Sequence, residues 1–229
     1  MPIQPNPCRH NPQAIIFDFD GVLVESFDVK SEAFRELLKD YPENIDAFIK
    51  YHVENGGVSR YEKIRFFFNQ LRKEPIGEKD VLKWCERYGK LVVQKVIDSK
   101  FVKGAEELLK SCYGRYEMFV VSGTPEEELK LIIRKRKLEY FFKGTFGSPA
   151  KKTTIVQKIL SDYKIDPKKA IFVGDAKADL EAAKDHHIAF IARLNGYNEE
   201  FFQNETLLGA FQDLTRVRTL LEDLEKVNI

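Results

Sequence analysis

Residues 15–26 read Ile-Ile-Phe-Asp-Phe-Asp-Gly-Val-Leu-Val-Glu-Ser, an apolar run that ends in two aspartates, Asp18 and Asp20, followed by Gly21. Residues 14–19 are apolar at nearly every position, which is typical of a strand buried on both faces in a parallel sheet. Carboxylates are rarely buried without a partner, so two of them at the end of such a strand need a counter-charge. Because hard divalent cations prefer oxygen ligands, Mg²⁺ is the expected counter-ion.

A second strand that ends in an acid lies far downstream. Residues 170–175 read Ala-Ile-Phe-Val-Gly-Asp, so Asp175 follows an apolar run, and Asp179 comes four residues later. The carboxyl ends of parallel strands share one edge of a sheet, where ligands bind. The two acid pairs are therefore candidates for one metal site.

A hydroxyl and two lysines lie between the acid pairs along the chain. Ser122 ends a predicted strand over 118–121, and Lys151 and Lys152 open a predicted helix. Each of these residues stands at the end of a strand or the start of a helix. The order acid pair, hydroxyl, lysine, acid pair is far more specific than any of its parts.

These four segments resemble the four motifs of the haloacid dehalogenase-like phosphohydrolase superfamily. In chain order they are Asp18-Phe-Asp20-Gly21-Val22, Val121-Ser122-Gly123-Thr124, Gly147-Ser148-Pro149-Ala150-Lys151-Lys152 and Gly174-Asp175-Ala-Lys-Ala-Asp179. The resemblance extends from about residue 13 to the last predicted helix and is weakest over 28–99. It is to the helical-cap subgroup, which includes phosphoglycolate phosphatases and beta-phosphoglucomutases. This resemblance implies a Rossmann-like parallel sheet flanked by helices, with an inserted helical cap.

The sequence pattern indicates the same α/β class and a division into two parts. Strands and helices alternate in the C-terminal portion, which predicts βαβ units; strands are expected near 14–19, 116–121, 144–147, 170–174, 188–192 and 209–211. Residues 28–99 instead show apolar side chains at helical spacing and no convincing strand. We therefore expect a core of residues 1–27 and 100–229 and a helical cap over 28–99, which moves about linkers near 26–28 and 99–103.

A helix is predicted directly after Ser122. Thr124 is a suitable cap, Pro125 suits the first helical position, and Glu127 completes a capping box. Such a helix would point free backbone N–H groups at whatever Ser122 faces, and anions bind readily there.

The resemblance implies roles for the first motif residues. Asp18 would be the nucleophile that forms an aspartyl-phosphate, and Asp20 the general acid and base. Mg²⁺ would be held by the Asp18 carboxylate, the Asp20 carbonyl and Asp175, while Ser122 would donate to a phosphoryl oxygen. The residue types alone indicate only an acid pair with a hard cation.

One lysine is expected to neutralise charge in the site. The resemblance implies Lys152 rather than Lys151, because many relatives place the lysine three residues after Ser-Pro; the other lysine is then a surface residue. Asp179, Gly123 and Lys151 are further candidates for contacts around the ligands or with the substrate. Asp179 could equally face solvent in the first turn of a helix.

A second candidate contact lies in the predicted cap. The segment Gly56-Gly57-Val58-Ser59-Arg60 resembles a loop with which some relatives reach the active site, and Arg60 could bind a second anionic group. A helix start capped by Ser59 explains the segment equally well.

Composition excludes several classes of function. The 229 residues carry a net charge of +1, which gives no footprint for nucleic acid, and no stretch is apolar enough to span a membrane. The polar N-terminus lacks a secretory pattern. Three cysteines without metal-type spacing indicate reduced thiols in a cytoplasmic protein: Cys8, Cys85 and Cys112. The four histidines are interpreted as structural or surface residues: His10, His52, His186 and His187.

The leading hypothesis is a Mg²⁺-dependent phosphomonoesterase that acts on a small phosphorylated metabolite, without nucleic-acid or membrane partners. Asp20 disfavours relatives that cleave carbon–halogen bonds and transport ATPases. Arg60 stands where phosphonate-cleaving relatives place a lysine, although Lys30 and Lys63 lie nearby in the sequence. A sugar-phosphate mutase is the alternative enzyme, but relatives of that kind usually carry a histidine near the position of Lys30. A non-catalytic binding module is the alternative outside enzymes. The sequence does not indicate the substrate or the oligomeric state.

Overall fold

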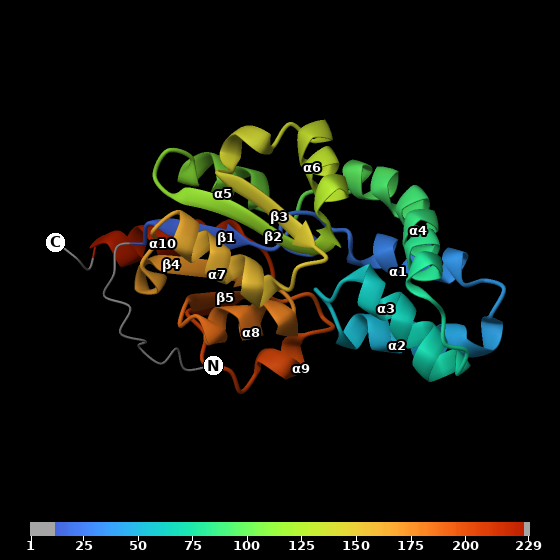
Figure 1. Ribbon diagram of the computed structural model, residues 1–229. Helices are drawn as coiled ribbons and strands as arrows, with labels where there is room; N and C mark the ends of the chain where they lie inside the picture. Colours follow the sequence, from blue (N-terminus) through green and yellow to red (C-terminus); the bar gives the residue numbers. More distant parts are fainter. Residues whose placement is uncertain (1–11, 227–229) are drawn as a thin grey trace.

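The computed structural model describes residues 12–226 and has a six-stranded parallel sheet at its centre (Figure 1). The strands are β1 (Ala14–Phe17), β2 (Glu117–Pro125), β3 (Gly144–Ser148), β4 (Ala170–Gly174), β5 (Ala189–Arg193) and β6 (Gly209–Phe211). Their order across the sheet is β3-β2-β1-β4-β5-β6, and every neighbouring pair is parallel. The predicted α/β class and all six predicted strands are confirmed.

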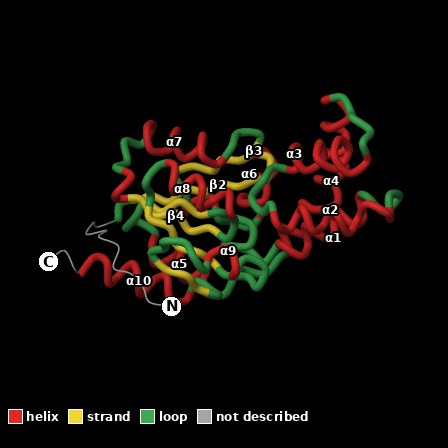
Figure 2. The backbone as a smooth tube through the Cα atoms, turned by 90° about the horizontal axis from the view of Figure 1, so that it is seen from below, coloured by secondary structure: helices red, strands yellow, loops and turns green. Residues whose placement is uncertain are grey.

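Helices cover both faces of the sheet. One face packs against α5 (Ala105–Cys112), α6 (Glu126–Lys135) and α10 (Thr215–Lys226), and the other against α7 (Lys152–Asp162), α8 (Lys177–Asp185) and α9 (Glu199–Phe202). Short 3₁₀ helices occupy Glu139–Phe141 and Pro167–Lys169. Figure 2 shows α7 and α10 on opposite sides of the strands.

Strand β1 illustrates why these runs are apolar at every position. Ile15 and Phe17 belong to the hydrophobic cluster on the α5 side, while Ala14 and Ile16 belong to the cluster on the α7 side. Successive side chains of a strand point to opposite faces, so a strand covered on both sides requires apolar residues throughout. The first polar side chain after β1 is then Asp18, at the edge of the sheet.

A run of helices separates β1 from α5. It consists of α1 (Phe27–Leu37), α2 (Pro42–Glu54), α3 (Arg60–Phe66), a π-helix η1 (Phe67–Arg72) and α4 (Glu78–Asp98). These helices lie together beyond one end of the sheet (Figures 1 and 2). Their interior is aromatic: the Phe34 ring centroid lies 4.0 Å from that of Tyr88 and 5.0 Å from that of Phe48. The helices therefore pack around aromatic side chains, which belong to the same hydrophobic cluster as the α5 face of the sheet.

The chain enters and leaves this helical part through two segments that lie side by side. Val24 forms an antiparallel bridge with Phe101, Glu25 N donates to Lys100 O at 2.9 Å, and Val102 N donates to Leu23 O at 3.0 Å. Paired segments of this kind would constrain how the helical part moves relative to the sheet.

The predicted start of the helix after Ser122 is wrong. Residues 122–125 continue β2, and α6 begins only at Glu126, without a side-chain cap. Pro125 pairs with Ser148 of β3, and the Thr124 hydroxyl donates to Asp20 at 3.0 Å instead of capping a helix. A hydrogen bond to a charged carboxylate is stronger than one to a backbone N–H, which explains the preference.

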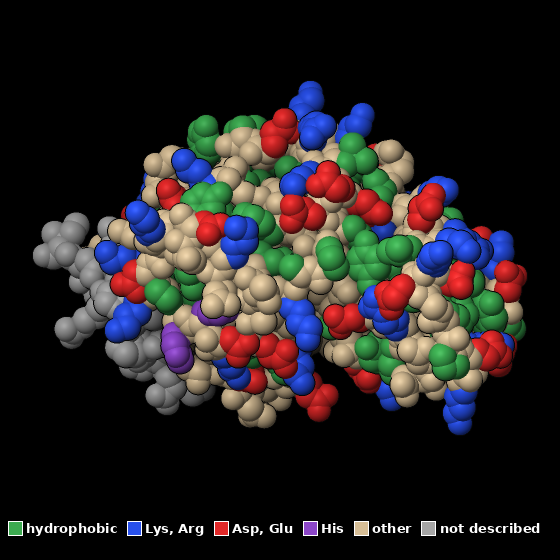
Figure 3. Space-filling model, viewed as in Figure 1, with side chains coloured by type: hydrophobic (Ala, Val, Ile, Leu, Met, Phe, Trp, Pro, Cys, Tyr) green, Lys and Arg blue, Asp and Glu red, His purple; other side chains and the backbone are tan. Residues whose placement is uncertain are grey.

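On the face shown in Figure 3, basic and acidic side chains are interspersed. Within residues 12–226, no helix has the length and apolar character required to cross a membrane. Cys85 and Cys112 are free and buried, whereas Cys8 and His10 lie outside the described residues.

Candidate active site

The two acid-bearing strands are neighbours in the sheet. β1 pairs with β4 so that Phe17 lies opposite Val173, and Asp18 N donates to Val173 O at 2.9 Å. Asp18 and Asp175 therefore leave the same edge of the sheet from adjacent strands. β1 is also where the strand order reverses, and crevices at such points bind ligands in α/β proteins.

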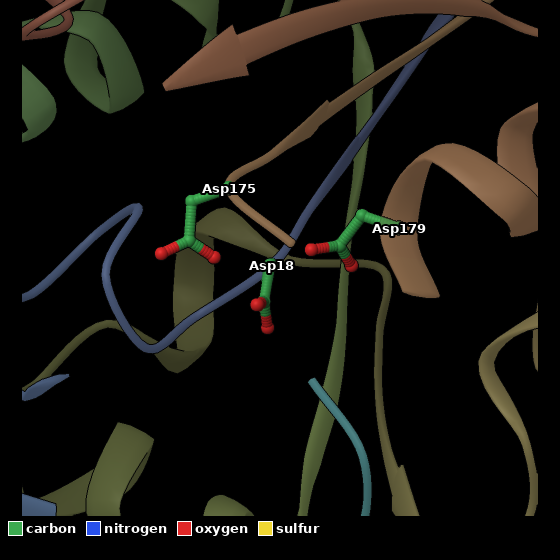
Figure 4. A group of neighbouring side chains, drawn as sticks. All are labelled: Asp18, Asp175 and Asp179. Carbon is green, nitrogen blue, oxygen red and sulfur yellow. The ribbon is translucent and has the colours of Figure 1, made fainter. Parts of the chain in front are cut away.

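Three carboxylates converge at this edge (Figure 4). Asp18, Asp175 and Asp179 each present an oxygen, and these oxygens lie within 4.8 Å of one another. All three residues are buried. Burial raises the pKa of Asp175 well above its ordinary value, and the neighbouring charges of Asp18 and Asp179 raise it further. The cluster therefore concentrates negative charge that needs compensation.

Gly21 lets the chain pass close to this cluster. Its φ of +77° lies in the left-handed region that favours glycine. A Cβ atom at this position would overlap the carboxylate of Asp175. Glycine therefore permits both the turn after Asp20 and the approach of that turn to Asp175.

Lys152 supplies positive charge that partly compensates the three carboxylates. Its Nζ lies 3.0 Å from Asp18 Oδ2 and donates to Asp179 Oδ1. Burial lowers the pKa of Lys152, but Asp179 and Asp18 more than offset this and raise it above its ordinary value. Lys151 is exposed at the start of α7. Asp179 is fully buried and also accepts from Ala176 N at 3.1 Å, so it does not face solvent.

Opposing interactions act on the pKa of the Asp18 carboxyl. Its pKa is raised to about 7, because burial, Asp179 and Asp20 raise it by more than Lys152 lowers it. Its Oδ1 also accepts from Phe19 N at 2.7 Å. A bound cation would favour the ionised carboxylate further.

The carboxylate of Asp20 is surrounded by hydrogen-bond donors. Its Oδ2 lies 2.5 Å from Lys30 Nζ and accepts hydrogen bonds from the hydroxyls of Ser122 and Thr124, each at 3.0 Å. Its Oδ1 accepts from Ser26 Oγ at 2.7 Å. Burial acts to raise its pKa, but Lys30 and the hydroxyls of Ser26 and Ser122 lower it below its ordinary value. Adjacent carboxylates thus have pKa values shifted in opposite directions, a pattern typical of acid–base sites.

Ser122 and Gly123 face the helical part. The Ser122 hydroxyl donates to Asp20 and accepts from Thr124 N at 3.0 Å. A Cβ on Gly123 would lie 2.5 Å from Gly57 O, so only glycine allows the loop before α3 to come this close. The lack of a side chain at Gly123 therefore allows the helical part to pack against the edge of the sheet.

A cavity of about 380 Å³ opens beside these groups. Asp18, Asp20, Asp175 and Ser122 line it from the sheet, and α1, α2, α3 and α4 line it from the other side. Its volume falls within the range that binds small molecules in proteins.

Comparisons with known proteins identify the family. The sequence profile described as haloacid dehalogenase-like hydrolase matches residues 15–193, which include all the acids above. The chain belongs to this haloacid dehalogenase-like hydrolase family. The resemblance drawn from the four motifs is therefore confirmed.

Curated relatives of this haloacid dehalogenase-like hydrolase are phosphatases. The phosphoglycolate phosphatase of Aquifex aeolicus is 30% identical over 183 residues, which are 75% of this chain and 80% of the relative. The phosphorylated carbohydrates phosphatase of Thermotoga maritima is 26% identical over 203 residues, 86% of this chain and 91% of the relative. The chain is thus an enzyme of the phosphatase type within this family, as expected.

Solved structures show the same fold. A haloacid dehalogenase-like hydrolase from Streptococcus pneumoniae has a TM-score of 0.67 at 19% identity and covers 91% of this chain and 98% of its own. A Bacteroides vulgatus protein, provisionally named a beta-phosphoglucomutase, has a TM-score of 0.75 at 16% identity. The match covers 95% of this chain and 90% of that protein. At these identities the likeness concerns the fold alone.

The residues present in this haloacid dehalogenase-like hydrolase fit a hard divalent cation. Asp18 and Asp175 offer carboxylate oxygens from adjacent strands, and oxygen ligands suit Mg²⁺. Asp179 is already engaged by Lys152 and by Ala176 N. Three buried acids thus share one lysine, which leaves negative charge that a cation between Asp18 and Asp175 would neutralise.

The site also contains residues that sequence reasoning missed or interpreted differently. Asn195 donates to Asp175 Oδ2 at 3.0 Å, and no motif pointed to it. His52, interpreted as structural or surface, lines the cavity, as do Lys30 and Lys63. Helical spacing indicated that residues 28–99 pack together, but it could not indicate which polar side chains face the sheet.

Arg60 also lies at the cavity wall, but its guanidinium is engaged. Its Nη2 lies 2.7 Å from Glu128 Oε2, and its Nη1 donates to Glu128 Oε1 at 2.9 Å. The guanidinium also lies 4.8 Å from the centre of the Tyr88 ring. Arg60 joins α3 to α6, and this pairing leaves little of it to bind a substrate anion.

Proposed function

We propose that this protein is a Mg²⁺-dependent phosphomonoester hydrolase that acts on a small phosphorylated metabolite through an aspartyl-phosphate at Asp18. The observation that carries the proposal is the contrast between Asp18 and Asp20. Asp18 lies in the acid cluster beside Lys152, whereas Asp20 is surrounded by hydrogen-bond donors that face the same cavity. A nucleophile and an acid–base group are the two carboxylates that such chemistry needs.

Asp18 would attack the phosphorus atom with a carboxylate oxygen. Lys152 lowers the pKa of that buried carboxyl and so favours its ionised form, and it would neutralise charge as the phosphoryl group approaches. The Ser122 hydroxyl lines the cavity and would donate to a phosphoryl oxygen. Mg²⁺ bound by Asp18, Asp175 and the Asp20 carbonyl would stabilise the negative charge on the phosphoryl oxygens.

Asp20 would protonate the leaving alkoxide and later deprotonate the attacking water. The contacts of Asp20 with Lys30 and the hydroxyls favour its ionised form, which suits the second step. The first step needs a protonated Asp20, and loss of the Lys30 contact would raise its pKa. Since Lys30 belongs to α1, movement of the helical part would change the protonation of Asp20.

We also propose that residues 28–99 act as a cap over a core of residues 1–27 and 100–229. The cap residues Gly57 and Arg60 contact Gly123 and Glu128 of the core, so the cap lies against the core beside the cavity. Closure would exclude water, and opening would admit substrate. A cytoplasmic location fits the free thiols of Cys85 and Cys112.

A phosphatase assay on the purified protein tests this function. We expect release of phosphate from p-nitrophenyl phosphate and from members of a panel of phosphorylated metabolites. EDTA should abolish the activity, and added Mg²⁺ should restore it. Full activity in chelator would contradict the metal, and no hydrolysis of any ester would contradict the function.

A further inference from the structure

Four lysine and arginine side chains are buried within residues 12–226: Arg60, Lys63, Lys152 and Arg193. Three of them have carboxylate partners, namely Glu128 for Arg60, Asp18 and Asp179 for Lys152, and Glu25 for Arg193. Among the described residues, Lys63 has no carboxylate within ion-pair distance. An unpaired buried charge is costly, so this exception needs a reason.

The contacts that Lys63 makes with its described neighbours leave one N–H bond of its ammonium without an acceptor. Its Nζ lies 2.8 Å from His52 Nδ1 and donates to His52 O at 3.3 Å. An ammonium has three N–H bonds, so one remains. When Lys63 is an ammonium it can only donate, so His52 Nδ1 then accepts and the ring proton is on Nε2. Within the described part of the chain, His52 Nε2 has no hydrogen-bond partner.

The surroundings of this pair are apolar on one side and open to the cavity on the other. The Phe34 ring centroid lies 4.9 Å from that of His52, and the Phe27 centroid lies 6.0 Å from it. Lys63, His52 and Lys30 all line the cavity that contains Asp18 and Asp175. Burial and the charge of Lys30 lower the pKa of Lys63 to about 7. An anion in the cavity would favour the ammonium form again.

The geometry points to Lys63 as a specificity-determining residue that binds a second anionic group of the substrate, with His52 as its positioning residue. This inference rests on the proposed function, in which the first anionic group, the phosphoryl group, lies at Asp18. Lys63 comes from α3 in the helical part and Asp18 follows β1 of the sheet, and both residues line the same cavity. The substrate would thus be a small phosphomonoester with an anion at its other end.

A carboxylate and a second phosphate are the two sources of such an anion, since both accept charge-assisted hydrogen bonds. Arg60 is not an alternative in this arrangement, because Glu128 already neutralises it. Lys30 is not one either, because it is paired with Asp20. Lys63 is the buried cation on the cavity wall that remains available among the described residues.

Matched pairs of substrates test the inference. The carboxylate pair is phosphoglycolate and ethyl phosphate, and the phosphate pair is propane-1,3-diyl bisphosphate and propyl phosphate. Initial rates of phosphate release give kcat/KM for each ester with the wild type, Lys63→Met and the matched control Lys83→Met. Lys83 is exposed on α4 and is paired with Asp80. The readout is the ratio of kcat/KM values within a pair, since a ratio cancels changes in the phosphoryl site common to both esters.

We expect the wild type and Lys83→Met to prefer the anionic member of at least one pair by about 10- to 100-fold, since a charged hydrogen bond to a buried group supports such a ratio. The pair that shows the preference identifies the anion. Lys63→Met should reduce that ratio to near one. A ratio near one in the wild type for both pairs would overturn the inference even if the variant did not fold, and so would an unchanged ratio in Lys63→Met. No phosphate release from any ester would instead overturn the proposed function and this inference with it.

Discussion

Lys152 Nζ lies 3.0 Å from Asp18 Oδ2, and both side chains are almost completely buried, with 4% and 3% of their area exposed. The lysine comes from the start of α7 and the aspartate from the end of β1, far apart in the sequence. In a buried setting an ion pair of this kind is sensitive to the loss of either partner, because the other charge remains uncompensated. The first prediction concerns this pair.

Replacing Lys152 by methionine should lower kcat/KM for p-nitrophenyl phosphate by roughly 100-fold or more, as expected for the loss of a charge-stabilising group. The matched control is Lys151→Met, the exposed neighbour, which should stay within about threefold of the wild type. Steady-state kinetics at saturating Mg²⁺ check both. Equal losses in the two variants would contradict the assignment of Lys152.

The second prediction concerns metal binding and has a readout other than activity. Mg²⁺ added to chelator-treated protein should raise Tm, since a ligand that binds only the folded state stabilises it. Asp175→Asn should lose most of this increase, whereas the control Asp185→Asn, exposed at the end of α8, should retain it. Differential scanning fluorimetry measures the shift. The same increase in Asp175→Asn as in the wild type would place the cation elsewhere.

The third prediction concerns the contact between Arg60 and Glu128 across α3 and α6. Glu128→Gln removes the charge that compensates buried Arg60 and should lower the free energy of unfolding by roughly 2–3 kcal/mol. Its neighbour Glu127 is exposed, and Glu127→Gln should change this free energy by less than about 0.5 kcal/mol. Urea denaturation of both variants measures these changes in the free energy of unfolding. If Glu128→Gln were as stable as Glu127→Gln, the ion pair would not secure the helical part.

The fourth prediction follows from the lowered pKa of Lys63, which burial and then Lys30 bring to about 7. Unfolding returns this pKa to its ordinary value, so between about pH 7 and 10 the unfolded chain binds more protons. The wild type should therefore gain free energy of unfolding as pH rises through this window. The other groups that act on Lys63 are Asp20, Lys152 and Asp175, with His52 in direct contact.

Lys63→Met should remove that gain. Relative to the wild type, the variant should be most stable near pH 7, and its advantage should shrink by an amount on the order of 2 kcal/mol toward pH 10. Urea denaturation across this range checks the slope, with Lys83→Met as a control that should follow the wild type. Parallel curves for wild type and Lys63→Met would show that Lys63 keeps an ordinary pKa.

Much of the fold was predictable from the sequence because strands buried on both faces are apolar throughout, as in Ile15–Phe17. The acids were predictable for the same reason, since Asp18 and Asp175 interrupt such runs at their ends. The start of α6 was not, because Thr124 and Pro125 suit a helix start locally while the tertiary structure offers them Asp20 and Ser148.

The cap side of the site was the least predictable part. A helical pattern shows that α2 and α3 have buried faces, but His52 and Lys63 come together only through the packing of two helices. Arg60 illustrates the same limit. Its residue type suits a substrate anion, yet Glu128, distant in the sequence, neutralises it.

The most direct test of the account is to trap the phosphoryl group on Asp18. Enzyme quenched during turnover can be treated with borohydride, which reduces an acyl phosphate to an alcohol and so converts a phosphorylated aspartate to homoserine. Peptide mass spectrometry then locates the change. We expect homoserine at position 18, dependent on substrate and on Mg²⁺. Homoserine at Asp20, Asp175 or Asp179 instead, or an unmodified Asp18 in enzyme captured during rapid turnover, would contradict it.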